Sequence, residues 1–240
     1  MKRAAVWLAV LIAVLAFAVG VVFYVAFGKN RPIVDGQTLG PGVQTVKDGF
    51  VSIFVLDAGP GKVALVDCGK DKAGEAILKA LQNRGLSPAS VSAIFITHGH
   101  GDHVAGCNLF KDAAVYGFAE DSPLMGENAK LTHPLKDGEA VDVGTLHVEA
   151  FATPGHTPGS AVYLADGVLF LGDSAGGAKD GTLMPAVTLF SSNPSQNRAS
   201  LKALAARLGP RAKEVRVLAF AHSGPLDGLS PLQRFAATAE

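Results

Sequence analysis

FITHGHGDH, residues 95–103, places three histidines and one aspartate within six residues of a 240-residue chain. The whole chain has only seven histidines, so this stretch concentrates nearly half of them. At this chain's own histidine and aspartate frequencies, the pattern His-x-His-x-Asp-His arises by chance about once in several thousand such chains. A polar loop that is histidine-rich by accident is therefore the weaker interpretation. The pattern predicts a metal site that directly follows an apolar strand.

The spacing inside this stretch predicts two groups of ligands. His98 and His100 are two residues apart, so a bent extended segment can direct both imidazoles toward one metal ion, and the glycine after each histidine supplies the bend. Asp102 and His103 then point elsewhere, which indicates a second ion nearby. Nitrogen and carboxylate oxygen ligands favour Zn²⁺, with Fe or Mn as alternatives. Because a catalytic zinc typically takes three protein ligands, later residues must complete the two sites.

Single polar residues at the ends of other apolar runs supply the candidates. Asp173 and His222 directly follow strand-like runs, and His156 follows one after a short Thr-Pro-Gly turn. Asp67 ends the apolar run at residues 63–66 in the same manner. Residues at the ends of several buried strands can converge on one edge of a sheet, where rigid elements hold their positions. We expect two three-ligand sites that share one bridging carboxylate.

Together these residues resemble the ligand pattern of the metallo-β-lactamase fold superfamily, which includes glyoxalase II-type thioesterases, lactonases, phosphodiesterases and zinc β-lactamases. The resemblance covers roughly residues 42–225 and implies an α/β (α+β) fold, a four-layer αββα sandwich with the metals at one edge of its two sheets. The implied roles are His98, His100 and His156 for the first metal, Asp102, His103 and His222 for the second, Asp173 as the bridge, and Asp67 behind the ligands, orienting them. The two remaining histidines, His133 and His147, fit neither set and are expected to be non-ligands.

The implied activity is metal-dependent hydrolysis of a small-molecule substrate. Two zinc ions about 3.5–4 Å apart share a water, lower its pKa toward neutrality and stabilise the developing oxyanion as Lewis acids. Asp102 can also pass a proton to the leaving group while it remains a ligand. An ester, a thioester, a lactone and a phosphodiester all suit a hydroxide activated in this way.

This sequence differs from particular branches of the superfamily, and these differences reduce the range of expected substrates. One kind of zinc β-lactamase has a cysteine where this chain has Asp173, and other kinds lack the bridging acid, which disfavours β-lactam hydrolysis. Glyoxalase II-type enzymes add a long helical C-terminal segment with basic substrate contacts, whereas only 18 residues follow His222. An iron-dependent persulfide dioxygenase on the same scaffold and a membrane-anchored binding protein without turnover are the alternatives from other classes.

The N-terminus predicts a membrane segment. Lys2 and Arg3 precede an uncharged apolar run over residues 4–27. As a helix this run is about 36 Å long, enough to cross a bilayer core of about 30 Å. A signal peptide cleaved after Ala18 is the alternative, but the apolar run continues past that point, which favours an uncleaved signal anchor. The flanking charges slightly favour an extracytoplasmic, periplasmic catalytic domain.

The rest of the chain predicts one mixed domain. The organisation we expect is a signal anchor at 1–28, a linker at 29–41 and the catalytic domain at 42–240. Strands are predicted at 49–57, 62–67, 92–97, 114–118, 145–153, 160–164, 168–171 and 215–221, and helices at 71–84, 195–208 and 231–237. With 21 basic and 21 acidic residues, the chain has no electrostatic footprint for nucleic acid.

The two cysteines leave three interpretations open. Cys68 and Cys107 are predicted first as buried, unpaired side chains, since free cysteine is among the most buried residue types. A single bridge between them is the alternative in an oxidising compartment, and a thiol role near the metal is a weaker third interpretation. The sequence makes no prediction of the oligomeric state.

Overall fold

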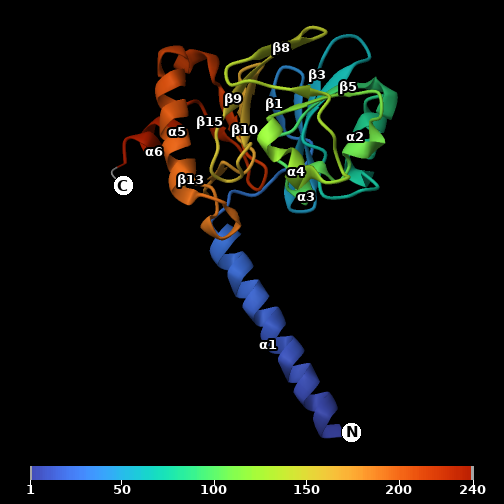
Figure 1. Cartoon of the computed structure of the whole chain (residues 1–240), viewed down its shortest axis with the longest axis vertical. Helices are drawn as coiled ribbons and strands as arrows, with labels where there is room; N and C mark the ends of the chain where they lie inside the picture. Colours follow the sequence, from blue (N-terminus) through green and yellow to red (C-terminus); the bar gives the residue numbers. More distant parts are fainter. Residues whose placement is uncertain (1, 239–240) are drawn as a thin grey trace.

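The protein consists of a domain with two main sheets, attached to one end of a long apolar helix (Figure 1). The computed structural model describes residues 2–238. The helix, α1 (Lys2–Phe27), projects away from the domain, and its C-terminal end meets the domain beside the segment that carries the short turn η4 (Thr188–Phe190). Within the described residues, one helical segment, Val10–Phe27, is long and apolar enough to cross a membrane, a test that a signal sequence also passes.

Two mixed sheets form the body of the domain. The first has the order β1-β2-β3-β4-β5-β6-β7 and the second has the order β15-β14-β11-β10-β9-β8. The strands of the first sheet are β1 (Thr38–Gly40), β2 (Val43–Asp48), β3 (Val51–Asp57), β4 (Val63–Val66), β5 (Val91–Phe95), β6 (Ala114–Gly117) and β7 (His133–Pro134). Those of the second are β8 (Ala140–Val143), β9 (Leu146–Ala152), β10 (Ala161–Ala165), β11 (Val168–Phe170), β14 (Val217–Ala219) and β15 (Leu226–Asp227). A separate hairpin pairs β12 (Ala175–Gly177) with β13 (Leu183–Pro185).

Helices cover the outer faces of both sheets. They are α2 (Glu75–Asn83), α3 (Gly101–Val104), α4 (Ser122–Met125), α5 (Pro194–Leu208) and α6 (Ser230–Ala236), with further 3₁₀ turns η1 (Pro88–Ser90), η2 (Cys107–Leu109), η3 (Ala119–Asp121) and η5 (Gly209–Glu214). Ile77 and Leu81 of α2, one helical turn apart, pack on the first sheet. Leu201 and Leu208 of α5 pack on the second. Phe54 and Phe170, from opposite sheets, meet in the layer between them. This gives the expected αββα order of layers.

Strand direction explains why one edge of this sandwich collects polar residues. β4, β5 and β6 run parallel in the first sheet, and β11 and β14 run parallel in the second. The carboxyl ends of parallel neighbours lie at the same edge of a sheet. Asp67 and His98 therefore leave the first sheet at one edge, and Asp173 and His222 leave the second sheet together.

Several predicted boundaries are wrong. The linker expected at 29–41 contains β1, which adds an edge strand to the first sheet. β2 was not predicted, although it pairs with β3 over its whole length. The helix expected from residue 71 begins at Glu75, because the Asp71 carboxylate accepts hydrogen bonds from the Ala73 and Glu75 backbone and forms a turn instead. β7, β8, β12, β13, β15, α3 and α4 have two to four residues each, too few to show a period.

The favoured prediction for the cysteines is also wrong. Cys68 and Cys107 form a disulfide, with their Cα atoms 5.2 Å apart. The bridge fastens the segment after β4 to η2, which follows the histidine cluster. The cysteines are 39 positions apart, and only the tertiary fold brings them together.

Candidate metal centre

All seven sequence-predicted ligands lie together at the edge of the sandwich. Three overlapping groups form there: His98 with His100 and His156; His98 with His103 and Asp173; and Asp102 with His103 and His222. In each group the potential ligand atoms lie within 4.8 Å of one another. The two histidines expected to be non-ligands lie outside these groups: His133 stacks on Tyr116, and His147 pairs with Asp142 at the surface.

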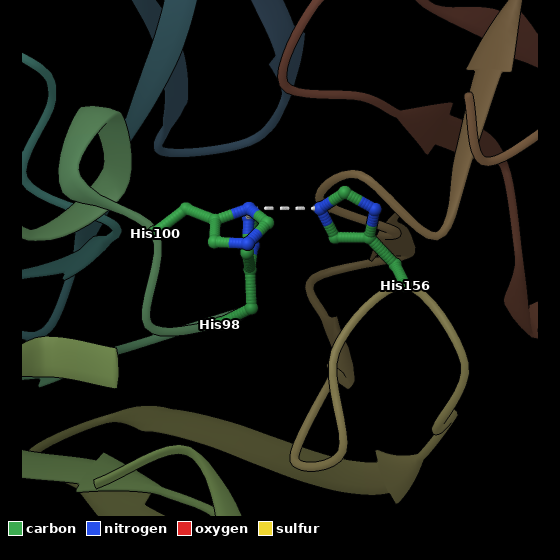
Figure 2. A group of neighbouring side chains, drawn as sticks. All are labelled: His98, His100 and His156. Atoms are coloured by element: carbon green, nitrogen blue, oxygen red, sulfur yellow. Dashed lines mark hydrogen bonds between the residues drawn. The ribbon is translucent and has the colours of Figure 1, made fainter. Parts of the chain in front are cut away.

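The first group consists of three imidazoles (Figure 2). The His100 Nδ1 atom lies 3.1 Å from the His98 Nε2 atom and 3.1 Å from the His156 Nε2 atom. Three nitrogens that ligate one tetrahedral zinc at 2.0–2.1 Å are about 3.3 Å apart. The two distances of 3.1 Å are close to this value, so they fit a single ion bound by the three ring nitrogens.

The second group comprises Asp102, His103 and His222. Asp102 and His103 belong to α3, a short helix that was not predicted from the sequence. The Asp102 Oδ2 atom is 3.9 Å from the His103 Nε2 atom and 3.4 Å from the His222 Nε2 atom.

Asp173 lies between the two groups. Its Oδ2 atom is 3.5 Å from the His156 Nε2 atom and 3.2 Å from the His222 Nε2 atom. Its Oδ1 atom is 3.4 Å from the His103 Nε2 atom, and neither of these two buried atoms has a hydrogen-bond partner among the described residues. Buried polar atoms without partners are costly. A divalent cation bound by both atoms would satisfy them, and the three imidazoles of the first group could hold another, so the donor set fits two divalent cations.

In His98, His156 and His222, the surrounding structure holds the ring nitrogen opposite the candidate donor atom. The His98 Nδ1 atom lies 3.1 Å from the Thr97 hydroxyl, and the His156 Nδ1 atom lies 3.2 Å from the Ser191 hydroxyl. The His222 Nδ1 atom lies 2.9 Å from the Phe50 carbonyl oxygen. Such contacts set the tautomer and orientation of an imidazole ligand.

Asp67 holds His103 in the same way. Its Oδ2 atom is 2.8 Å from the His103 Nδ1 atom and accepts a hydrogen bond from the Thr97 hydroxyl at 2.7 Å. Its Oδ1 atom accepts from the Thr97 backbone N–H at 2.8 Å. Asp67 is almost fully buried and adopts a left-handed backbone conformation, with φ at 61°. It contacts one candidate ligand and the start of the segment that carries two others.

Asp121 is a positioning residue that the sequence did not reveal. Its carboxylate accepts hydrogen bonds from the Gly99 N–H at 2.7 Å, the Thr157 hydroxyl at 2.7 Å and the Gly159 N–H at 2.6 Å. It therefore ties the His98–His100 segment to the loop that carries His156. Asp121 follows neither a motif nor an apolar strand, so no local signal distinguishes it from a surface acid.

The buried environment sets the protonation of the metal-free donors. Burial lowers the pKa of His98 well below its ordinary value and lowers the pKa of His156 to about 4. Burial also opposes the charged form of His103, but the carboxylates of Asp173 and Asp67 outweigh it and raise the pKa of His103 to about 9. For Asp173, burial favours the neutral form, yet His222 and His103 hold its pKa well below the usual range. Near neutral pH, His98 and His156 are therefore neutral and able to bind a metal.

Comparisons with known proteins show the family to which the chain belongs. The model of the metallo-β-lactamase superfamily matches residues 46–222, and the chain belongs to this superfamily, as the resemblance predicted. A hydroxyacylglutathione hydrolase from Thermosynechococcus vestitus is 38% identical over 159 residues, which cover 63% of this chain and 57% of that protein. A hydroxyacylglutathione hydrolase from Xanthomonas axonopodis pv. citri is 35% identical over 126 residues, 51% of this chain and 45% of its own. The chain spans about half the length of such relatives.

Solved structures share the same fold. A metallo-β-lactamase family protein from Thermus thermophilus superposes with a TM-score of 0.63 at 26% identity, covering 83% of this chain and 80% of that one. A metallo-β-lactamase from Cronobacter sakazakii superposes with a TM-score of 0.65 at 20% identity, covering 88% and 92% of the two chains. The second likeness shows the fold alone.

Proposed function

We propose that this protein is a metal-dependent hydrolase that holds two divalent metal ions, zinc first, with iron or manganese as alternatives. The first ion is assigned to His98, His100 and His156, and the second to Asp102, His103 and His222, with Asp173 shared by both. The observation that carries this assignment is that two buried atoms, His103 Nε2 and Asp173 Oδ1, lie 3.4 Å apart in the donor cluster and make no hydrogen bond within the described residues.

Bound metals would supply a water of lowered pKa and Lewis-acid charge for the developing oxyanion. The protein contributes orientation and proton transfer. Asp102 is the most exposed of the carboxylates in the site, at 29% against 14% for Asp173, so it is the acid best placed to exchange a proton with solvent or a leaving group. Asp67 and Asp121 position the donor side chains through hydrogen bonds to His103 and to the segments that carry His98, His100 and His156.

The bond that we propose for hydrolysis is an ester or thioester bond. Relatives named hydroxyacylglutathione hydrolase support a thioester, which lies within the ester, thioester, lactone and phosphodiester range that the site chemistry accommodates. Because this chain matches only about half of those relatives, we do not extend the proposal to their glutathione substrate. The aspartate at position 173 continues to disfavour β-lactam hydrolysis.

The proposal is tested by metal analysis and a substrate screen of the full chain. The purified protein is expected to bind two zinc ions and to hydrolyse acetyl esters or thioesters. Replacing His98 and His100 by alanine should remove the first ion and lower turnover to background. His147→Ala, an exposed histidine outside the site, is the matched control and should retain both properties. One bound iron with oxygen uptake, or full turnover in the double variant, would refute a dizinc hydrolase.

We further propose that α1 anchors the domain at the extracytoplasmic face of a membrane. The support is the apolar segment Val10–Phe27 together with the Cys68–Cys107 disulfide, since disulfides persist mainly in oxidising compartments. Protease treatment of intact spheroplasts tests the side: digestion of the domain is expected, and full protection would contradict this placement.

A further inference from the structure

The end of α1 forms part of the candidate active site. Asn30, three residues beyond the helix, donates its side-chain N–H to the His222 carbonyl oxygen at 2.8 Å. Asn30 also pairs with Ala178 after β12, and the Lys179 ammonium group donates to the Gly28 carbonyl oxygen at 2.9 Å. The Phe27 ring lies 5.6 Å from the His222 ring. These contacts fasten the apolar helix directly to the metal edge of the domain.

A cavity of about 530 Å³ lies between this helix end and the domain. One wall is formed by α1 residues such as Val21, Val25 and Phe27, and the other by the segment 184–190. His156, Asp173 and His222 also line it, so the cavity reaches the metal donors themselves. Its volume lies in the range of small-molecule sites. The helix residues that line it follow Ala18, so they would remain after cleavage at that position.

The cavity wall selects an apolar ligand. Among the lining residues that the structure describes, Asp173 and the two histidines of the site are the titratable ones, and none is a lysine or arginine. A second cavity of about 630 Å³, on which Asp102, Ser191 and Ser192 open, shares Asp173 and His222 with the first. The donor atoms therefore lie where an apolar cavity meets a more polar one. This arrangement fits a ligand with an apolar tail, a reacting centre and a polar head.

The surroundings of the helix end match a membrane surface. Phe50, Leu189 and Phe190 are large apolar side chains with 50%, 67% and 43% of their surfaces exposed. Leu189 and Phe190 line both cavities, and Phe190 stacks on Phe27 with ring centroids 6.1 Å apart. Exposed apolar groups around the end of a membrane-spanning helix favour contact with the bilayer. The mouth of the apolar cavity would then open beside acyl chains.

We propose that the substrate is an amphiphilic acyl ester or thioester from the bilayer, whose acyl chain lies along residues 21–27 in the apolar cavity. This rests on the proposed hydrolase function and on α1 as a membrane anchor. The carbonyl group lies at the donor cluster and the polar head in the second cavity. Water supplies the hydroxyl group of the released carboxylic acid, the acyl C–O or C–S bond breaks, and the remaining proton of that water goes to the alcohol or thiol.

Acyl-chain selectivity tests this proposal with two matched variants. Val25 lines the cavity, whereas Tyr24 on the same helical turn does not, and both are 76% exposed. In the full-length protein in detergent, kcat/KM is measured for acetyl, butyryl, hexanoyl and octanoyl thioesters. Each added methylene should raise kcat/KM by up to about fourfold until the cavity is filled. Val25→Trp should lower the octanoyl-to-acetyl ratio at least about tenfold, since roughly two buried methylenes account for that factor, and Tyr24→Trp should retain it.

The outcomes of this experiment distinguish failure of the acyl-chain proposal from failure of the proposed hydrolase function. Metal-dependent acetyl hydrolysis without a chain-length preference would overturn the proposal and leave the hydrolase function standing. No hydrolysis of any ester or thioester by the fully metallated protein would overturn the hydrolase function itself.

A second measurement does not depend on turnover. Palmitate that carries a terminal diazirine is placed in nanodiscs with the metal-free full chain and photolysed. The proposal expects crosslinks on the half-buried residues Met184 and Pro185, lost in Val25→Trp and kept in Tyr24→Trp. Crosslinks confined to the N-terminal part of α1 would overturn it.

Discussion

Replacing Asp67 by asparagine isolates the effect of one buried carboxylate on the second metal site. The backbone of Asp67 has a φ of 61°, a conformation that asparagine tolerates, so the substitution preserves shape. When His103 binds a metal through Nε2, its Nδ1 atom carries the proton and donates it to Asp67 Oδ2 over 2.8 Å. Asp67 Oδ1 simultaneously accepts from the Thr97 N–H over 2.8 Å.

Asparagine cannot satisfy both donors. Its amide has one oxygen and one NH₂ group, so in either orientation an N–H faces an N–H. The variant loses one charge-assisted hydrogen bond, worth about 1.5–3 kcal/mol, and leaves a buried donor without a partner. Since about 1.4 kcal/mol corresponds to tenfold in an equilibrium constant, the second metal should bind about 10- to 100-fold more weakly. The first group does not contact Asp67 directly, so its affinity should change less.

Competitive titration against a chelator measures both affinities. Asp142→Asn is the matched control, because Asp142 also accepts from a histidine Nδ1 atom, that of His147 at 2.6 Å, but at the exposed surface. This control should leave metal binding unchanged. An Asp67→Asn variant that binds the second metal within about twofold of the native protein would refute the reasoning, because the expected loss is at least about tenfold.

Three further predictions follow from the same geometry. The pKa of His103 is raised to about 9 in the metal-free protein, so a metal that binds His103 Nε2 below that pH displaces a proton. The affinity of the second site for metal should therefore increase as pH rises toward 9. Calorimetry in buffers of different ionisation enthalpy measures the proton release, and no release near neutral pH would contradict the prediction. Reducing the Cys68–Cys107 bridge should lower Tm by roughly 10 °C from loop entropy, and a scan with and without reductant that shows no shift would disprove it. Asp121→Asn should weaken first-site metal binding by about tenfold or more, because one of its three donors loses its acceptor; unchanged titration would exclude this positioning role.

The candidate donors could be predicted from the chain because each has a local signal. His98 and His100 alternate within one short segment, and Asp173 and His222 end apolar runs that form β11 and β14. Such signals depend on neighbours in sequence, which a single chain displays directly. The long strands and the helices α2 and α5 could be predicted for the same reason, since the period of their apolar residues is set by local geometry.

Other features depend on contacts between distant segments. Asp121 has no sequence signal, yet it links residues 22 and 38 positions away. The cysteine pairing was predicted wrongly because free burial and a bridge look alike in sequence. The short strands β1, β7 and β15 exist because neighbouring strands offer backbone hydrogen bonds, and their own residues show no period.

By itself, the sequence determined the superfamily, the seven candidate donors and an apolar N-terminal helix. The tertiary structure alone decided the distances between the donor atoms, the contribution of Asp121, and that the end of α1 lines a cavity leading to the donors. The physical reason is that ligand type and hydrophobicity are properties of single residues and their neighbours. Distances between donor atoms, and the walls of a cavity, arise only when sheets and helices pack.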